Sequence, residues 1–342
     1  FAPITTVEGA GEWIVRTEEN LAYLDPAGIK QEFILQRFYA PVVDFVLVRD
    51  GNIYSLTDTG NGSLRLDRVS PREGWINELD TRRDVEGNPR IAPIFSADGK
   101  SLVWSRADEN ETMTRAVFIS SLETGESREI WRAELPTEAS GHALVPIFYD
   151  EARQMLVYAL HTFYSGMTPT QVASLYVADV AADKITPLWT LNPAEIYAGV
   201  SATVSPDGRL LAYLTWGEPQ ADFTLPWTLH IRDLSNGNET THRLTETWEI
   251  AEVHLLAPDG NKVLLTTSRR TPNDDYQTEM LIFNLQDQTW NSIYAPDYDA
   301  KPYFNPRAWT DGDWLILTNS DDDSTWVMRP DGESLTQITP LE

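Results

Sequence analysis

Two clusters of carboxylates are the residues with the clearest potential for chemistry, at positions 273–275 and 319–324. Carboxylate and amide oxygens are the ligands that Ca²⁺ prefers in proteins. The second cluster does not form an EF-hand loop, because its sixth position is Ser324 instead of Gly and its twelfth is Pro330 instead of Glu. Both clusters are therefore expected to be solvated acidic loops. Any bound calcium should be held there, and the candidate ligands are Asp274, Asp275, Asp321 and Asp323.

The sequence contains no complete catalytic motif. It has no Cys, which excludes a thiolate nucleophile, a thiolate metal site and a disulfide framework. It also lacks a Gly-x-Ser-x-Gly elbow, a His-Glu-x-x-His zinc motif and the glycine loops that bind phosphates. His254 lies inside an apolar, strand-like run, where we expect a hydrogen-bonded structural role. His230 and His242 are expected at the surface of outer strands.

The charge of the chain bounds the class of its partners. Its 52 Asp and Glu and 26 Lys and Arg give a net charge of −26. Such a surface repels phosphate backbones, which argues against nucleic acid and suits a basic partner or divalent cations. No run of about 18 apolar residues exists, so no membrane span is expected. The chain begins at Phe1 without Met, which favours either an exported protein that lost a targeting segment or a trimmed chain.

Turn signals recur along the chain at nearly even intervals of 48 to 57 residues. The six signals are Asp50-Gly51, Asp98-Gly99, Asp150-Glu151, Asp207-Gly208, Asp259-Gly260 and Asp311-Gly312. Each lies between two short runs rich in Val, Ile, Leu, Tyr and Trp, the residues that favour strands. Glycine in such a turn supplies the positive φ that a tight hairpin demands. Four short strands repeated with this period are typical of β-propeller blades.

The pattern therefore predicts an all-β chain that forms one seven-bladed β-propeller of four-stranded antiparallel blades, with six or eight blades as alternatives. The expected blades span residues 1–37, 38–85, 86–134, 135–192, 193–246, 247–296 and 297–342. Closing such a ring would hide most strand edges, and exposed edges promote aggregation.

Four hairpin segments carry a family resemblance: residues 96–104, 205–213, 257–265 and, more loosely, 309–314. They resemble the S-P-D-G-k-x-i-a-f hairpin of the PD40, or WD40-like, repeats of TolB-type propellers. Residues 329–332 (Arg-Pro-Asp-Gly) resemble the outer-strand turn of the same family. The resemblance covers about residues 90–340 and implies the fold. It implies no single function, because the family includes periplasmic envelope proteins, peptidase propellers and unassigned lipoproteins.

Blade topology predicts where a binding surface lies. In a propeller, the loops between second and third strands open on the face opposite the Asp-Gly turns. Here those loops are long, at residues 106–114, 161–172, 216–227, 268–278 and 319–324, and they mix aromatic with acidic residues. Long loops on a rigid scaffold commonly carry function. The expected partner-binding residues are Tyr164, Trp216, Asp222, Tyr276, Asp321, Asp322 and Asp323.

Three functions fit these patterns. The leading hypothesis is a non-catalytic, exported binding scaffold that docks a protein partner, of basic character, on the acidic and aromatic face. The alternative is a propeller hydrolase or lyase, with carboxylates and a divalent metal at the channel mouth and single residues drawn from several blades. The third is a carbohydrate-binding protein in which Trp216, Trp227 and Trp248 form stacking platforms.

Overall fold

The computed structural model is built of strands and turns. It describes residues 13–16, 20–24, 30–34, 45–49, 52–58, 64–70, 75–80, 94–107, 114–121, 123–124, 126–133, 139–164, 170–190, 201–218, 220–221, 224–270, 276–296, 303–309, 313–322 and 324–337. Among these residues no helix has the length and apolar character needed to cross a membrane. The chain divides into two compact units, which are residues 1–36 with 201–342 (unit 1) and residues 37–200 (unit 2).

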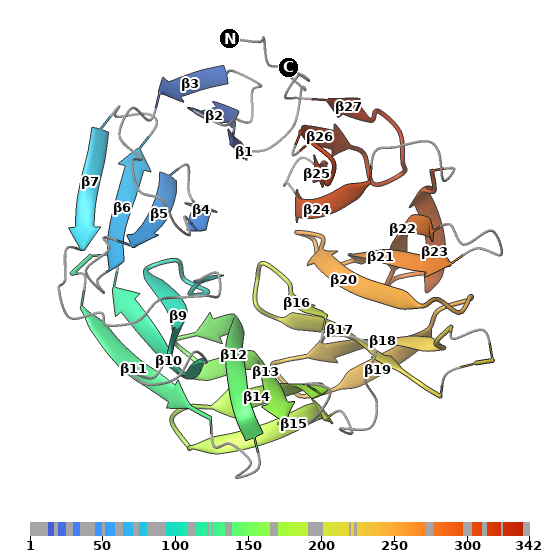
Figure 1. The fold of residues 1–342 in the computed structure, drawn as a ribbon, viewed down its shortest axis with the longest axis horizontal. Helices are drawn as coiled ribbons and strands as arrows, with labels where there is room; N and C mark the ends of the chain where they lie inside the picture. The colour runs from blue at the N-terminus through green and yellow to red at the C-terminus, as the bar shows by residue number, and fades with distance from the viewer. Residues whose placement is uncertain are drawn as a thin grey trace. The chain divides into compact units, whose positions relative to one another are not determined.

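Unit 1 contains antiparallel sheets whose strands pair in chain order (Figure 1). Its N-terminal part forms a three-stranded sheet of β1 (Trp13–Arg16), β2 (Asn20–Leu24) and β3 (Lys30–Ile34). The next sheet comprises β16 (Ala202–Val204), β17 (Leu210–Trp216), β18 (Trp227–Asp233) and β19 (Glu239–Arg243). It is followed by β20 (Ile250–Leu256), β21 (Lys262–Arg270), β22 (Tyr276–Asn284) and β23 (Thr289–Tyr294). The last sheet holds β24 (Phe304–Trp309), β25 (Leu315–Asn319), β26 (Thr325–Met328) and β27 (Thr336–Gln337).

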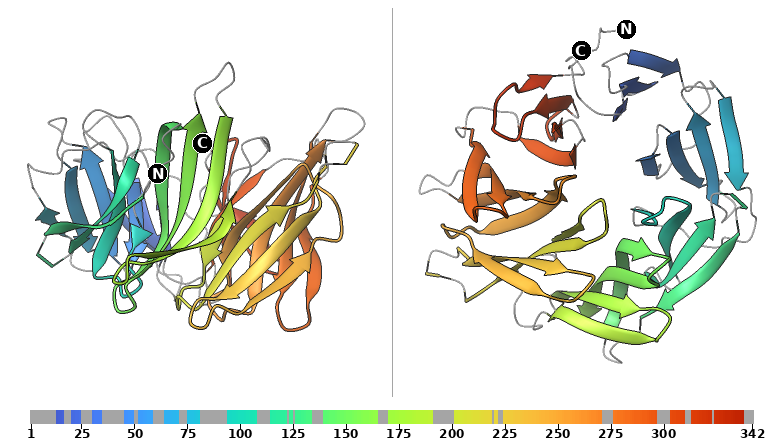
Figure 2. Two further views of the ribbon diagram at one scale, coloured as in Figure 1. Left: turned by 90° about the horizontal axis from the view of Figure 1, so that it is seen from below. Right: turned by 180° about the vertical axis from the view of Figure 1, so that it is seen from behind.

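Unit 2 repeats the same plan. One four-stranded sheet comprises β4 (Phe45–Arg49), β5 (Asn52–Asp58), β6 (Leu64–Ser70) and β7 (Trp75–Asp80). Two further groups are β8 (Ile94–Phe95), β9 (Ser101–Ala107), β10 (Thr114–Ser121) and β11 (Ser127–Arg132), then β12 (Ala139–Asp150), β13 (Met155–Tyr164), β14 (Thr170–Asp179) and β15 (Lys184–Thr190). A parallel contact between Thr114 and Ala143 joins these two groups into one eight-stranded sheet. Figure 2 shows the long strands β12, β13 and β14 side by side.

The second strand of each well-described sheet lies deepest in the core. Leu211, Val263 and Leu315 are 0% exposed, whereas β19 at the edge of its sheet is mostly exposed. A strand buried on both faces needs a continuous apolar run instead of an alternating one. Each such side chain contributes about 1.5–3 kcal/mol on burial. The β20–β23 and β24–β27 sheets pack through one apolar cluster, whose members include Leu264 and Leu317.

The Asp-Gly turns of unit 1 and unit 2 share one geometry. Gly99, Gly208 and Gly260 have φ values of 69°, 69° and 70°. The N–H of each glycine donates to the carbonyl three residues earlier, at 2.8, 2.8 and 2.9 Å. Only glycine adopts this left-handed conformation without steric cost, so the predicted role of these glycines is confirmed.

The three other predicted turns either differ in register or lie outside the described residues. At Asp150-Glu151 the residue with positive φ is Gln154, at 51°, so the signal read from the sequence precedes the tight position by several residues. Asp50-Gly51 and Asp311-Gly312 lie outside the described residues, and Asp313, which follows the second pair, has a φ of 59°. Gln154 and Asp313 are therefore non-glycine residues with left-handed backbone conformations.

Short strands precede and follow the Asp98-Gly99, Asp207-Gly208 and Asp259-Gly260 turns, as the turn signals predict. The all-β class and the four-stranded antiparallel blade are therefore confirmed, and the number of blades stays a prediction. Two expected loops were too long. β13 extends to Tyr164 before β14 starts at Thr170, and β21 extends to Arg270 before β22 starts at Tyr276. Cross-strand pairing continues past the apolar run, because polar residues also pair across neighbouring strands.

Candidate functional site

The structure shows part of the predicted binding surface. Trp216 ends β17, and Asp321 and Asp322 form the exposed turn after β25. Tyr164 ends β13 and Tyr276 begins β22, so these two residues belong to strands and not to loops. The other predicted site residues lie outside the described residues: Asp222, Asp274, Asp275 and Asp323.

Trp216 rests on a rigid aromatic base. It pairs across the β17–β18 hairpin with Trp227, and the two ring centroids are 5.1 Å apart with an interplanar angle of 59°. The indole Nε1–H of Trp227 donates to the carbonyl of Trp248 at 3.0 Å. Trp227 and Trp248 are 1% and 2% exposed. The predicted platform of three tryptophans for sugar stacking is therefore wrong, because two of its rings lie in the core.

An arginine continues this cluster toward the β21–β22 hairpin. The guanidinium of Arg269 lies 4.7 Å from the centre of the Trp248 ring and pairs with Glu246 at 2.9 Å. Its Nε–H donates to Gln277 Oε1 at 3.2 Å. The chain of contacts Trp216–Trp227–Trp248–Arg269–Glu246 thus links the ends of two neighbouring sheets. We call the exposed parts of these residues the Trp216–Arg269 surface.

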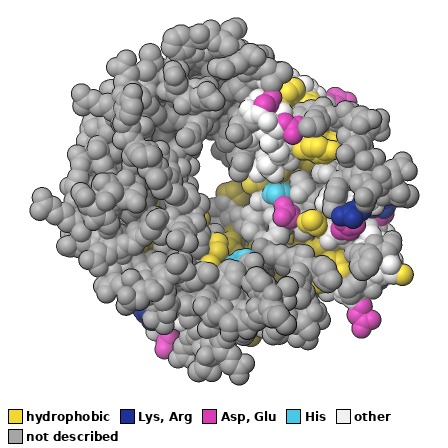
Figure 3. Space-filling view, viewed as in Figure 1, with side chains coloured by type: hydrophobic (Ala, Val, Ile, Leu, Met, Phe, Trp, Pro, Cys, Tyr) yellow, Lys and Arg dark blue, Asp and Glu magenta, His cyan; other side chains and the backbone are white. Residues whose placement is uncertain are grey.

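The Asp321–Asp322 turn is organised by its own side chains. Asn319 Oδ1 accepts the N–H of Asp321 at 3.1 Å, and Asp322 Oδ1 accepts the N–H of Ser324 at 2.9 Å. Slight burial acts to raise the pKa of Asp322, but the hydrogen bonds from Ser324 outweigh it and hold that pKa below its usual value. Acidic side chains are scattered over the described part of the face seen in Figure 3. No group of three or more metal-ligating side chains converges among the described residues.

Sequence reasoning missed a polar chain on β17, β18 and β19. Thr215 Oγ1 lies 2.8 Å from His230 Nε2, and His230 Nδ1 lies 3.0 Å from Glu239 Oε1. The Tyr213 hydroxyl donates to Glu239 Oε2 at 2.9 Å, and its ring stacks on His230 with centroids 4.6 Å apart. The register explains the cluster: Tyr213 is opposite His230, and alternate residues of paired strands share a face.

A hydroxyl, an imidazole and a carboxylate in this order form the arrangement that activates nucleophiles. Here Glu239 also serves Tyr213 and, at 3.4 Å, Arg232. Burial acts to raise the pKa of Glu239, but hydrogen bonds from His230 and Tyr213 outweigh it and hold that pKa below its usual value. The Glu239 carboxylate thus accepts hydrogen bonds from three donors. Polar groups in a partly buried cluster require such partners, because an unpaired buried polar group is costly. We therefore interpret this network of hydrogen bonds between Thr215, His230 and Glu239 as structural.

The structure also tests the roles predicted for His254, His230 and His242. His254 Nε2 lies 2.7 Å from Thr266 Oγ1, which confirms the hydrogen-bonded structural role. The surface positions predicted for His230 and His242 are confirmed only in part, because both residues are partly buried. His230 is half-buried beneath Tyr213, and His242 packs its ring 4.5 Å from Phe283 of the neighbouring sheet. Burial lowers the pKa of His242. An outer strand in a propeller still packs against the next blade, which the sequence pattern alone does not reveal.

No protein family and no curated protein matches the sequence. Among solved structures, the chain resembles the tricorn protease with a TM-score of 0.60 and 11% identity, over 99% of this chain and 34% of that one. It resembles an oligogalacturonate lyase from Vibrio parahaemolyticus with a TM-score of 0.59 and 10% identity, over 98% and 86%. It resembles the β-propeller domain of the Trilobed protease from Pyrococcus furiosus with a TM-score of 0.52 and 12% identity, over 87% and 85%.

These similarities establish the fold. The chain is a β-propeller, and the resemblance of its hairpins to those of PD40-type propellers is confirmed at that level. The chain spans about a third of the tricorn protease. One fold hosts many functions, so the activities of these proteins do not transfer to this chain.

Proposed function

We propose that the chain is a non-catalytic scaffold that binds a protein partner through the strand ends bearing the Trp216–Arg269 surface. The proposal rests on the packing that holds the Trp216 ring in place. Its half-buried ring leans on a fully buried tryptophan, which is itself hydrogen-bonded to a third. An aromatic side chain held in place before binding loses little conformational entropy, and such residues dominate binding energy in protein interfaces.

The charge of these strand ends suits a basic partner. Glu218, Asp321 and Asp322 are exposed, and Glu246 beside Trp248 is 54% exposed. Together with the net charge of −26, these carboxylates should steer a cationic surface toward the scaffold and make association salt-sensitive. Tyr276 belongs to the same proposal in unit 1. Tyr164 of unit 2 is likewise proposed to contact the partner, and so are Asp222 and Asp323 in their loops.

We also propose where calcium would bind and where the protein is located. Asp274, Asp275, Asp321 and Asp323 are the proposed ligands of any calcium ion, which would relieve repulsion among clustered carboxylates. An extracytoplasmic location is proposed from the TolB-type character of the hairpins and remains to be measured by fractionation of the source cells.

A hydrolase or lyase is the second candidate. It is favoured by one observation, the Thr215–His230–Glu239 chain, whose distances of 2.8 and 3.0 Å match those of an activated nucleophile. The solved structures of the same fold include a protease and an oligogalacturonate lyase. If this candidate is right, purified chain should cleave peptides or polygalacturonate, and His230→Gln should abolish that activity without unfolding the protein.

Crosslinking in extracts of the source organism, followed by titration of the purified partner, tests the leading proposal. The double variant Trp216→Ala with Tyr276→Ala should weaken the partner by about 2–4 kcal/mol. Trp290→Ala serves as the control, because this half-buried tryptophan packs on Phe283 in β22 away from the Trp216–Arg269 surface. Crosslinks confined to the ends bearing the Asp-Gly turns, or equal losses for control and test variants, would refute the assignment.

A further inference from the structure

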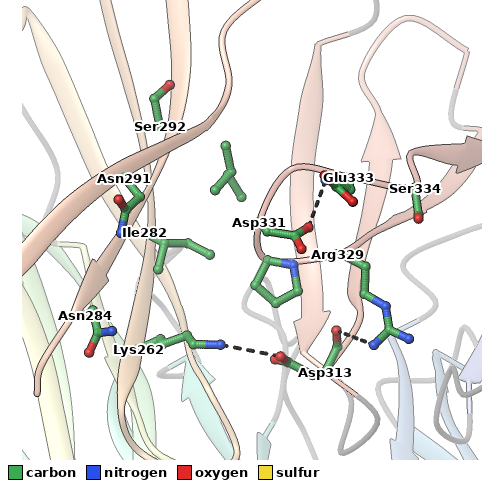
Figure 4. A pocket seen from close by; sticks show the side chains of 12 residues that line it. Lys262, Ile282, Asn284, Asn291, Ser292, Asp313, Arg329, Asp331, Glu333 and Ser334 are labelled. Carbon is green, nitrogen blue, oxygen red and sulfur yellow. Dashed lines mark hydrogen bonds and ion pairs between the residues drawn. The ribbon is translucent and has the colours of Figure 1, made fainter.

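A cavity opens at the opposite ends of two sheets in unit 1. It has a volume of about 740 Å³ and lies between the β20–β23 sheet and the β24–β27 sheet (Figure 4). Lys262, the first residue after the Asp259-Gly260 turn region, lines it from one side, and the Arg329–Gly332 turn segment lies on the other. Cavities of roughly 300–1,000 Å³ are of the size that accommodates small ligands. The binding surface proposed above lies at the other strand ends.

The base of the cavity is apolar. Ile282 and Ile293 are 3% and 8% exposed, and Pro330 faces them from the neighbouring sheet. The wall formed by β23 presents the amide of Asn291, whereas the hydroxyl of Ser292 points to the other side of the strand (Figure 4). An aliphatic chain could therefore lie on the base while polar groups of the same molecule bond to this wall.

At one end of the cavity, cations of the chain itself are already held. Lys262 Nζ lies 3.4 Å from Asp313 Oδ2. The guanidinium of Arg329 lies 4.0 Å from the centre of the Trp314 ring and donates to the carbonyl of Asp313 at 3.3 Å. Lys262 and Arg329 thus line the cavity while their charged groups already contact Asp313 and Trp314.

At the other end, the carboxylates of Asp331 and Glu333 are exposed, and neither forms an ion pair with a basic residue of the described part. Their turn is fixed in position. Asp331 Oδ1 accepts the N–H of Glu333 at 2.9 Å, and Gly332 has a φ of 85°. A Cβ on Gly332 would lie 2.4 Å from the carbonyl oxygen of Ile293, so the turn is seated directly on β23. The two carboxylates therefore border the cavity on a turn that is held against β23.

We propose that this cavity binds an extended peptide segment through a lysine or arginine side chain. The aliphatic stem lies over Ile282 and Ile293, and the cationic head bonds to Asp331 and Glu333. The amide of Asn291 bonds to the peptide backbone. The site is independent of the Trp216–Arg269 surface, so the scaffold has a second, separate point of attachment for a basic chain.

The test uses the full chain and four blocked pentapeptides, Gly-Ala-X-Ala-Gly, with Lys, Arg, Gln or Glu at X, titrated by calorimetry. The Lys and Arg peptides should bind about tenfold or more tightly than the Gln peptide, because a charge-assisted hydrogen bond is stronger than a neutral one. Their affinity should fall as the salt concentration rises. The Glu peptide should not bind.

The double variant Asp331→Asn with Glu333→Gln should lose about tenfold or more of the Lys-peptide affinity. Asp287→Asn is the matched control, because Asp287 Oδ1 also accepts a backbone N–H in a turn, that of Thr289, outside the cavity. Trp216→Ala should leave peptide affinity unchanged, which separates this site from the proposed partner surface. Circular dichroism and the thermal midpoint check that each variant is folded.

Three outcomes would overturn the proposal: equal affinity for the Lys and Gln peptides, no binding up to about 10 mM peptide, or undiminished affinity in the folded double variant. Tighter binding of a neutral disaccharide such as maltose, lost in the Asn291→Ala variant, would assign the cavity to carbohydrate instead.

Discussion

Replacing Gly332 by Ala should destabilise the protein more than the same change at Gly260, although both glycines lie in the left-handed region. Their φ values are 85° and 70°. The surroundings differ. A Cβ at Gly332 would lie 2.4 Å from the Ile293 carbonyl oxygen, which belongs to the backbone of β23 and cannot rotate away. A Cβ at Gly260 would meet only side-chain atoms of Arg209 and Leu210 at 3.7 Å, an ordinary van der Waals distance.

The magnitudes follow from these two terms. Holding an alanine in the left-handed region costs about 1–2 kcal/mol, and both variants incur that cost. At Gly332 the turn must also move off β23, and overpacking of this kind costs about 1–3 kcal/mol more. We therefore expect a loss of about 1–2 kcal/mol for Gly260→Ala and of about 2–5 kcal/mol for Gly332→Ala.

Urea denaturation followed by tryptophan fluorescence measures both free energies of unfolding. The comparison holds if the dependence of the free energy on urea is the same for each variant, because a changed slope signals a changed unfolded or native state. Equal losses at the two positions would show that the Arg329–Gly332 turn segment does not contact β23 as the structure has it. No loss at either position would contradict the positive φ values themselves.

Three further outcomes are expected. Trp227→Ala should cost about 3–5 kcal/mol in thermal or urea unfolding because it empties a fully buried site, and half-buried Trp216→Ala should cost less than half of that; a larger loss for Trp216 would reverse their assigned roles. The pKa of Glu239 is lowered in the folded state, so its contribution to stability is present above its unfolded pKa and is lost as pH falls through the folded value. The stability lost in the Glu239→Gln variant at neutral pH should therefore become smaller on acidification. A loss that stays constant with pH would show that ionisation of Glu239 is not involved. Millimolar calcium chloride should raise the thermal midpoint relative to EDTA, and Asp321→Asn should reduce that rise; identical midpoints with and without calcium would end the calcium proposal.

Local features of this chain could be predicted from its sequence. The order of strands follows from short apolar runs separated by turn residues, and Gly99, Gly208 and Gly260 occupy the left-handed turns that their Asp-Gly context indicates. The deeply buried second strands follow as well, because Leu210–Trp216 is an unbroken apolar and aromatic run save for Thr215. These features depend on neighbours within a few residues, which the linear sequence displays directly.

The side-chain environments were decided by tertiary structure. Trp227 and Trp248 read as exposed platforms in the sequence but are buried, while Trp216 of the same type remains half-exposed. The Thr215–His230–Glu239 chain exists because three strands align in one register, and nothing in the spacing of those residues indicates it. Strand propensity and turn chemistry constrain a residue's conformation, whereas burial and partners depend on which strand lies opposite.

The lining of the cavity also depends on tertiary structure and could not be predicted from the sequence. Lys262 and Asp313, which pair at one end of it, come from different sheets, and the Asp331 turn reaches β23 only because Gly332 permits a close backbone approach. The sequence determined that residues 329–332 form a turn and that neighbouring strands pair as antiparallel hairpins. Only the packing of one sheet on the next determined that this turn and Asn291 line the same cavity, because the energy of that contact depends on surfaces that meet after the strands have formed.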